Sequence, residues 1–177
     1  MIVTTLKSKD EVLSGIKRHG VKRLFLLGCG DCATICGTGS EEVLLERKKE
    51  LESLGFAVTG ISVVEVGCNA AQVSISFAKQ KQAIKEAEAL LVFSCGLGIQ
   101  SAAMHLREPK LVFAACDTHS VGVVNKQHQA EQLCSLCGEC NLTETGSVCV
   151  KTLCPKEMAN GPCGGVSEGK CEVFRDR

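Results

Sequence analysis

Hydrophobic and polar positions follow helical and strand periods in turn along the first two thirds of the chain. A capping-box spacing at Ser8 and Glu11 precedes apolar positions at helical intervals, and it predicts a helix over residues 9–19. A second helix is predicted between a cap at Ser40 and a stop at Gly55. The remaining patterns predict a helix within residues 72–90 and strands at 22–28, 56–66, 90–94 and 111–115.

Strands and helices that alternate in this way predict a small Rossmann-like or flavodoxin-like α/β fold. Helices would cover both faces of a parallel sheet, and right-handed crossovers would order its four strands 2-1-3-4. From Lys126 onward this patterning stops, and cysteine and glycine become frequent. We therefore expect an α/β domain over residues 1–125. An irregular cysteine-rich metal-binding module over residues 126–177 would need its metal in order to fold.

Cysteine makes up 13 of the 177 residues, an odd number with repeated C-x2-C spacing, which favours metal–thiolate sites over a disulfide framework. The first residues, MIVTTLKSKDE, contain no apolar signal segment, and no apolar run approaches the ~20 residues that span a bilayer. We therefore expect a reduced, cytoplasmic protein without a membrane partner. Zero net charge and the absence of Trp and Tyr argue against nucleic acid as a partner.

Four cysteines follow the predicted strands directly: Cys29, Cys68, Cys95 and Cys116. All four would lie along the carboxyl edge of the sheet, where open α/β folds bind ligands, and the first loop adds two more thiols in GCGDCATICGTG. Four of these thiolates could converge on one [4Fe–4S] cluster. The predicted ligands, with Cys29 as a substitute, are Cys32, Cys36, Cys68 and Cys95. Cys116 is expected to belong to the core.

Other interpretations of this edge stay open. A single cysteine near a strand end is commonly a small buried hydrophobe, although six together are harder to explain in that way. Gly28-x-Gly30-x-x-Ala33 could form a dinucleotide-binding turn, but Thr38 and Gly39 interrupt the helix that such a turn requires. Cys95 could also act as a nucleophile in an enzyme, with either of two histidines as its base, His105 or His119.

The strongest motif lies near the carboxyl terminus. The first three of its cysteines have the C-x2-C-x2-C spacing of ferredoxins: Cys134, Cys137 and Cys140. Four more follow: Cys149, Cys154 (before Pro155), Cys163 and Cys171. Seven thiolates complete one tetrathiolate cluster with three left over. Zinc in a closed structural site is the alternative to iron–sulfur, above all for the last four cysteines.

The segment CSLCGECNLTETGSVCVKTLCPKEMANGPCGGVSEGKCEV resembles the methylenetetrahydrofolate reductase C-terminal domain family. This family includes the small cysteine-rich subunit that accompanies a flavin-bearing barrel subunit in acetogen-type enzymes. CPK-x4-NGPCGG, from Cys154 to Gly165, is its most distinctive part, and the stretches GCGDCATICGTG and SCGLGIQ look like the same subunit. Family members usually carry a further cysteine beyond the CEV segment, and proline rather than Val150 after the residue matching Cys149.

The resemblance implies an iron–sulfur subunit with two or three [4Fe–4S] clusters that relays electrons to the flavin of the barrel subunit. That partner would hold flavin and folate and reduce methylene-tetrahydrofolate to methyl-tetrahydrofolate. A ferredoxin or a further subunit would supply the electrons. The family's small subunit has also been regarded as zinc-binding, so a second hypothesis is a zinc-stabilised adaptor that docks redox or methyl-transfer subunits.

Overall fold

A computed structural model describes residues 1–127, 129–156 and 163–174 of the chain. The chain divides into two compact units, Met1–Ser120 and Val121–Arg177. The expected domain boundary at residue 125 stays a prediction. Residues 157–162 of the CPK-x4-NGPCGG motif lie outside the described residues.

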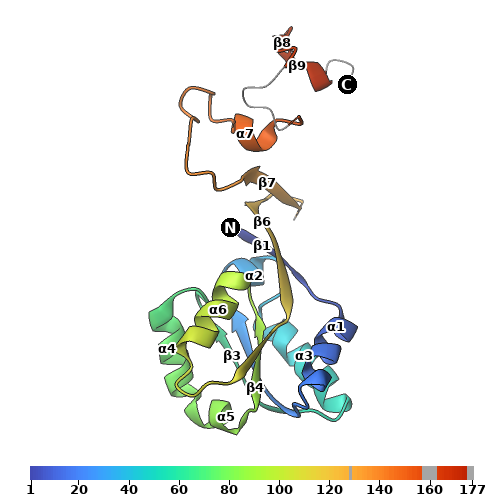
Figure 1. The fold of residues 1–177 in the computed structure, drawn as a ribbon, viewed down its shortest axis with the longest axis vertical. Coiled ribbons are helices and arrows are strands. Elements are labelled where there is room, and N and C mark those ends of the chain that lie inside the picture. The colour runs from blue at the N-terminus through green and yellow to red at the C-terminus, as the bar shows by residue number, and fades with distance from the viewer. Residues whose placement is uncertain (128, 157–162, 175–177) are drawn as a thin grey trace. The chain divides into compact units, whose positions relative to one another are not determined.

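The first unit is built on a four-stranded parallel sheet (Figure 1). Its strands are β2 (Arg23–Cys29), β3 (Ala57–Val64), β4 (Ala89–Phe93) and β5 (Leu111–Ala114). Their order is β3-β2-β4-β5. In the register of the sheet, Leu26 of β2 lies opposite Ile61 of β3 on one side and Leu91 of β4 on the other. The predicted parallel sheet and its order 2-1-3-4 are therefore confirmed.

Helices cover both faces of this sheet (Figure 1). They are α1 (Lys9–Arg18), α3 (Glu41–Ser53), α4 (Ala70–Lys79), α5 (Lys81–Glu86) and α6 (Gly96–His105). Alternate residues of β2 serve the two faces, because side chains of a strand point to opposite sides. Leu24 and Leu26 join the core beneath α1 and α3, whereas Phe25 and Leu27 join the core beneath α4, α5 and α6.

The helix starts follow local capping chemistry. Ser8 Oγ accepts a hydrogen bond from Glu11 N at 3.2 Å, and Ser40 Oγ accepts one from Val43 N at 3.4 Å, so both predicted caps are confirmed. Gly55 has φ +86° just beyond the cap of α3, which agrees with its predicted role as a stop. The helical stretch within 72–90 is two helices, because the chain breaks at the shared cap Gln80.

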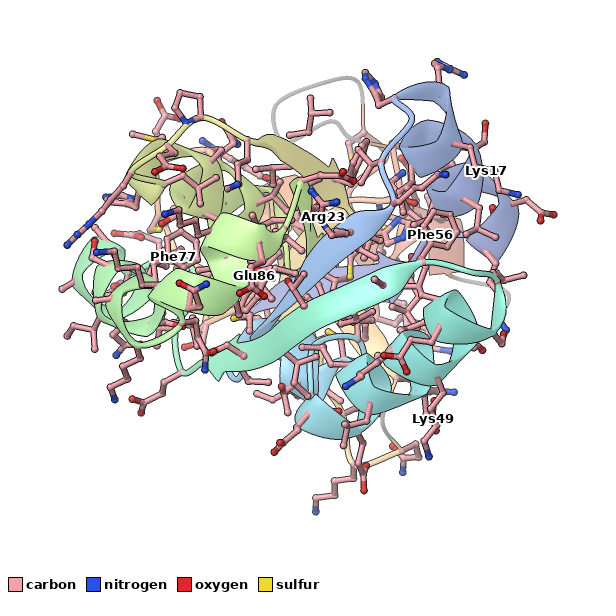
Figure 2. The ribbon with its side chains drawn as sticks, turned by 90° about the horizontal axis from the view of Figure 1, so that it is seen from below. Lys17, Arg23, Lys49, Phe56, Phe77 and Glu86 are labelled. Carbon is pink, nitrogen blue, oxygen red and sulfur yellow. The ribbon has the colours of Figure 1, made fainter. Side chains whose placement is uncertain are left out.

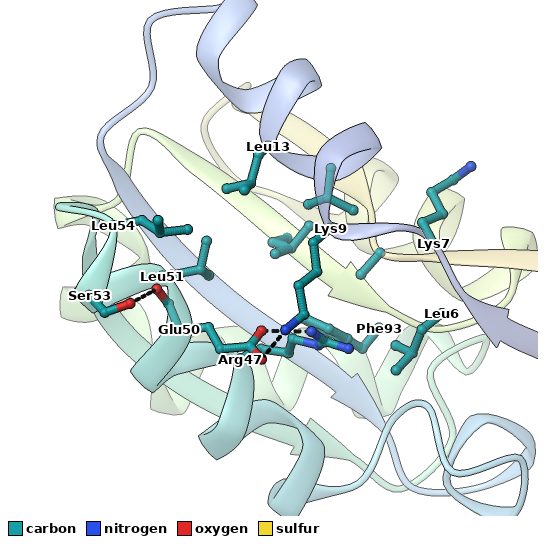
Figure 3. Close-up of a pocket in the computed structure, with 13 residues that line it drawn as sticks. Leu6, Lys7, Lys9, Leu13, Arg47, Glu50, Leu51, Ser53, Leu54 and Phe93 are labelled. Atoms are coloured by element: carbon teal, nitrogen blue, oxygen red, sulfur yellow. Dashed lines mark hydrogen bonds and ion pairs between the residues drawn. The ribbon is translucent and has the colours of Figure 1, made fainter.

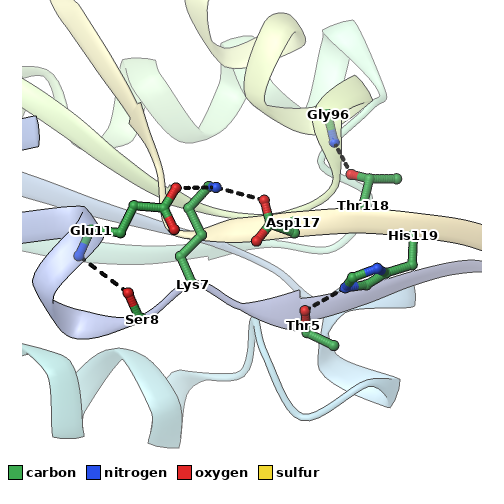
Figure 4. Close-up of polar contacts among 8 residues, drawn as sticks. All are labelled: Thr5, Lys7, Ser8, Glu11, Gly96, Asp117, Thr118 and His119. Carbon is green, nitrogen blue, oxygen red and sulfur yellow. Dashed lines mark hydrogen bonds and ion pairs between the residues drawn. The ribbon is translucent and has the colours of Figure 1, made fainter.

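In the first unit, two strands and two helices were not predicted: β1 (Ile2–Leu6), β6 (Cys116–Val124), α2 (Cys32–Ile35) and α6 (Gly96–His105). Both strands mix polar and apolar residues without strict alternation, so periodicity does not reveal them. Figure 4 shows β1 beside the first half of β6, where Thr5 Oγ1 and His119 Nε2 are 2.6 Å apart. Lys7 Nζ also pairs with Asp117 at 2.6 Å.

Figure 2 looks onto the amino-terminal edge of the sheet. There Arg23 Nε donates a hydrogen bond to the Glu86 carbonyl at 2.9 Å, and Arg23 pairs with Glu88 at 3.1 Å. These contacts tie the start of β2 to the end of α5. The loops that carry the cysteines lie at the opposite, carboxyl edge of the sheet.

The second unit is built mainly from turns and short elements. They are the end of β6 with β7 (Ala130–Cys134), α7 (Val150–Leu153), the β8–β9 hairpin (Val166–Ser167 and Lys170–Cys171) and a 3-10 turn (Glu172–Phe174). Among the described residues, no buried apolar side chain lies beyond Cys116. The second unit thus has no hydrophobic core in its described part. No helix in the described ranges is long and apolar enough to span a bilayer.

Candidate metal centres

Cysteines gather at the carboxyl edge of the parallel sheet. Cys29 is the last residue of β2, and each neighbouring strand is followed within a few residues by its own cysteine, Cys68 after β3 and Cys95 after β4. Cys29 and Cys95 are buried, whereas Cys68 is exposed. The edge therefore presents thiols from three adjacent strands, two of them shielded from solvent.

Cys29 lies in the middle of this edge, in contact with the loop that precedes Cys68. Gly67 N donates a hydrogen bond to Cys29 Sγ at 3.3 Å. A Cβ at Gly67 would stand 3.3 Å from both Cys29 Sγ and Ser94 Oγ. Gly67, which precedes Cys68, thus packs against both Cys29 and Ser94.

The two thiols of the first loop turn toward the start of the chain. Ile2 N donates to Cys32 Sγ at 3.4 Å, and Cys36 Sγ lies 3.8 Å from the Ile2 carbonyl. Burial raises the pKa of the Cys32 thiol, and the charges of Asp31 and Cys29 add to this increase. Cys32 and Cys36 therefore share one backbone partner, Ile2, close to Cys29.

One buried hydroxyl at this edge lacks a partner. Ser94 Oγ is 2% exposed as a residue and, within the described part of the chain, makes no hydrogen bond. A Cβ at Gly98 would overlap Ser94 Oγ, so only glycine lets α6 approach so closely. An unpaired hydroxyl beside Cys29 suits a bound group that accepts a hydrogen bond, such as the sulfur of a cluster. The residues present at this edge thus fit an iron–sulfur group.

Cys116 differs from the other thiols of the first unit. It is 3% exposed and belongs to the hydrophobic core beneath α1 and α3. Burial raises its pKa to about 11, although a hydrogen bond with Thr38 opposes this increase. A buried neutral thiol behaves as a small hydrophobe, and this agrees with its expected place in the core.

The structure explains the glycines of the dinucleotide-like turn differently. A Cβ at Gly28 would overlap the carbonyl oxygen of Gly39, so this glycine allows two backbone segments to cross. The helix that follows, α2, has four residues. Such a helix is too short to present the aligned amides of a phosphate-binding helix.

The two histidines considered as bases for Cys95 have other partners. His105 Nδ1 donates to the Ser101 carbonyl at 2.7 Å, and His119 Nε2 is bound to Thr5 Oγ1. Cys95 itself is the cap of α6, and its carbonyl accepts a hydrogen bond from Ile99 N at 3.0 Å. Both histidines thus have a hydrogen-bond partner other than Cys95.

In the second unit, four cysteines line one hollow of about 520 Å³, which we call the cysteine hollow. They are Cys134, Cys137, Cys140 and Cys149. Left-handed backbone at Leu136 (φ 57°) and Gly138 (φ 77°) folds the C-x2-C-x2-C loop, and Leu136 N donates to Cys134 Sγ at 3.3 Å. Amide-to-sulfur bonds of this kind are typical of thiolate metal sites.

Cys149 joins the triplet through α7. Its Sγ lies 3.4 Å from Thr152 Oγ1, and this hydroxyl, together with backbone amides and Lys151, lowers the pKa of the Cys149 thiol. The Glu139 carboxylate raises the pKa of Lys151, and the charges of Cys137 and Cys149 contribute. A lysine therefore lies within electrostatic range of two thiols of the hollow.

The last cysteines form a separate group around the β8–β9 hairpin. Gly165 N donates to Cys163 Sγ at 3.2 Å, and Cys171 lies opposite Val166 in the hairpin. Lys156 pairs with Glu172 at 2.5 Å, and the charges of Cys163 and Cys171 also raise the pKa of this lysine. Cys154 is half-buried and does not line the cysteine hollow.

In the described parts of the chain, no group of three or more Cys, His, Asp or Glu side chains stands in a ready-made metal arrangement. In these parts of the chain, the structure places several thiols in the same region but does not arrange them as a complete set of metal ligands. Sequence reasoning missed Ser94, although a serine at the end of the apolar run LLVFS is a signal. It also assigned no chemistry to Lys156, whose partner Glu172 is distant in sequence.

Two solved structures are similar to part of this chain. The chain is similar to the crystal structure of arylmalonate decarboxylase, with 18% identity and a TM-score of 0.43. It is also similar to an extracellular ligand-binding receptor from Verminephrobacter eiseniae, with 22% identity and a TM-score of 0.41. Each match covers 59% of this chain, and they cover 44% and 29% of the other chains. The chain thus spans less than half the length of either protein.

A search of curated proteins found no significant match. Residues 113–177 match the family described as methylene-tetrahydrofolate reductase C terminal. This segment contains the cysteine hollow and the hairpin group, so the match falls on the cysteine-rich part of the chain. Residues 113–177 are therefore similar to the methylene-tetrahydrofolate reductase C-terminal domain family.

Proposed function

We propose that this chain is the iron–sulfur electron-transfer subunit of a methylenetetrahydrofolate reductase complex. The observation that carries the proposal is the cysteine hollow, where four thiols from the C-x2-C-x2-C loop and the start of α7 surround one space. Four thiolates are the ligand set of a cubane cluster. A cluster bound there supplies a one-electron carrier.

The ligands in the cysteine hollow would be the four cysteines that line it. This grouping makes Cys149 the fourth ligand, and it leaves three cysteines for the hairpin group, Cys154, Cys163 and Cys171. Glu172 lies beside Cys163 and is a further oxygen donor within that group. Three thiolates and one carboxylate are a less favourable ligand set than four thiolates, for zinc as well as for a third cluster.

At the carboxyl edge of the sheet, Cys29 is a better central ligand than a substitute. Cys29 contacts the loop of Cys68 through Gly67, which also lies close to Ser94, and the charge of Cys29 acts on Cys32. We therefore place the second centre on Cys29 with four candidate partners: Cys32, Cys36, Cys68 and Cys95. Ser94 would donate a hydrogen bond to a sulfur of that centre, and donors of this kind tune its potential.

The partner would be a flavin-containing barrel subunit that holds the folate site, with a ferredoxin or a further subunit as the donor. The family match of residues 113–177 supports this partner. Apolar side chains of the second unit are exposed, among them Leu136 (70%) and Val166 (71%), and a partner would bury them. Electrons from the donor would pass along this chain and reduce the flavin by two electrons.

A zinc-stabilised adaptor is the second candidate. The hairpin group favours it, because Cys171 on a tight hairpin and Cys163 just before that hairpin, with an amide donor to Cys163 Sγ, also suit structural zinc. In that case the second unit would hold subunits together without carrying electrons.

The test is flavin reduction in the anaerobic complex of this chain with the flavin subunit. Reduced ferredoxin is mixed with the complex, and the flavin absorbance is followed in time. We expect the chain to accelerate flavin reduction about tenfold or more over the flavin subunit alone, a barrier difference of about 1.4 kcal/mol. The complex must first be shown to have intact stoichiometry. If its flavin is then reduced no faster than that of the flavin subunit alone, the result would contradict electron transfer and favour the adaptor.

A further inference from the structure

A second hollow of the first unit lies far from the cysteines in the fold. It has a volume of about 310 Å³ and lies between α4, α5 and the segment that follows α6. Its floor is apolar and includes Phe77, Ile84 and Leu106. Phe77 is labelled in Figure 2, on the side of the sheet covered by α4. The volume is at the lower end of the range for small-molecule sites.

Basic side chains surround this floor. Four of them are permanently cationic near neutral pH: Lys81, Lys85, Arg107 and Lys110. Against them stands one carboxylate, Glu108. Among the ion pairs formed by described residues, none involves any of these four cations. We call this site the cationic hollow.

The hollow between α1 and α3 provides a contrast within the same unit. It has a similar volume, about 300 Å³, and Figure 3 shows Lys9 and Arg47 at its rim. Both of these cations pair with Glu50 at 2.6 Å. Glu50 thus pairs with two cations of the hollow between α1 and α3, whereas the cations of the cationic hollow have no ion-pair partner among the described residues.

Helix ends account for only part of the charge in the cationic hollow. Lys85 and His105 lie in the last turns of α5 and α6, where a positive charge is favourable. Lys81 is the first residue of α5, where a positive charge is unfavourable. Lys81 and Lys85 are also four residues apart on one helix, a spacing at which like charges repel. A bound anion would remove both penalties.

We propose that the cationic hollow binds a small organic anion with an apolar part and two or more phosphate or carboxylate groups. Arg107 offers a planar fork for one anionic group, and the lysines supply point charges for another. Lys110 Nζ is held by the Ala87 carbonyl at 2.7 Å, so its position is fixed before the anion binds. The apolar floor takes the uncharged part. The proposal is independent of any metal centre.

The test is isothermal titration calorimetry on the full chain with three probes. ADP supplies two phosphates on a nucleoside with an aromatic base, citrate supplies carboxylates, and adenosine supplies the uncharged nucleoside alone. We expect ADP or citrate to bind with a Kd below about 1 mM, and the probe that binds identifies the anionic group. Adenosine should not bind, and affinity should fall as salt is raised.

Two variants and one control complete the design. Lys81→Ala and Arg107→Ala should each weaken binding about tenfold, because each removes a charged contact. Lys49→Ala removes an exposed lysine of α3 and should leave affinity unchanged. Thermal unfolding should show the anion raising the Tm of the original chain more than that of the two variants. The proposal is overturned if neither anion binds, or if all three variants bind equally well.

Discussion

Replacing Cys149 by alanine is expected to remove one whole metal centre from the protein. Cys149 lines the cysteine hollow together with the C-x2-C-x2-C triplet, so its loss leaves three thiolates where four are needed. An iron–sulfur centre would take about four iron atoms per chain with it. Metal analysis of anaerobically purified variant and original chain measures this loss.

The same substitution should unfold the second unit selectively. Because no buried apolar side chain is found among its described residues, metal binding would supply most of its folding free energy. For structural zinc in small domains that contribution is about 10 kcal/mol or more. Limited proteolysis should therefore cut within residues 121–177 of the variant, while thermal unfolding of the α/β unit stays the same.

A double variant tests the grouping of ligands. Cys137→Ala and Cys149→Ala together should lose no more metal than either change alone, because both residues serve one centre. Cys116→Ala is the matched control, since this thiol is buried in the core and should leave metal content unchanged. Additive losses in the Cys137/Cys149 pair would contradict the grouping. In that case Cys154, which precedes Pro155, becomes the candidate for the fourth ligand of the triplet.

The second large effect is expected from Gly28→Ala. A new Cβ would overlap the backbone carbonyl of Gly39 and press on Leu44 Cδ1 at 3.0 Å, and the backbone cannot yield as a flexible side chain does. Overpacking of a rigid core costs about 1–3 kcal/mol and occasionally more, and we expect the upper part of this range. Chemical denaturation of the purified chain measures the change in the free energy of unfolding.

This substitution should also disturb the carboxyl edge of the sheet. Gly28 precedes Cys29, and the loop it packs against, at Gly39, follows Cys36. Metal bound at this edge should therefore decrease together with stability. Gly15→Ala is the matched control. Gly15 lies inside helix α1, and a Cβ there would meet the Phe113 side chain at 3.9 Å, an ordinary contact distance. It should stabilise the chain by up to about 1 kcal/mol. Equal effects of the two substitutions would contradict the crossing of backbones at Gly28.

The parallel sheet could be predicted from sequence because its central strands are fully buried. The run LLVF, from Leu90 to Phe93, has an apolar residue at every position, and Leu90 and Leu91 are at most 2% exposed. Strands β1 and β6 escaped prediction, since Thr5 and His119 face one another in an exposed contact that gives no apolar pattern. Long-range pairing, rather than local preference, makes these two segments strands.

The places of the cysteines at the strand ends could be predicted from the sequence, whereas their grouping as metal ligands stays a prediction. Strand ends placed Cys29, Cys68 and Cys95 along one edge, yet spacing alone ranked Cys29 as a substitute rather than as the thiol between two loops. In the second unit, the left-handed residues Leu136 and Gly138 set the path of the loop, and spacing does not report such turns. The pairing of Lys156 with Glu172 likewise depends on a fold that joins distant residues.

The most direct measurement is the iron, zinc and acid-labile sulfide content of the anaerobically purified chain, with electron paramagnetic resonance after reduction by dithionite. The proposed two cubane centres predict about eight iron atoms and as many sulfides per chain, with the signals of reduced [4Fe–4S] clusters. Zinc without iron or sulfide would contradict the electron-transfer role and leave the chain as a zinc-stabilised adaptor.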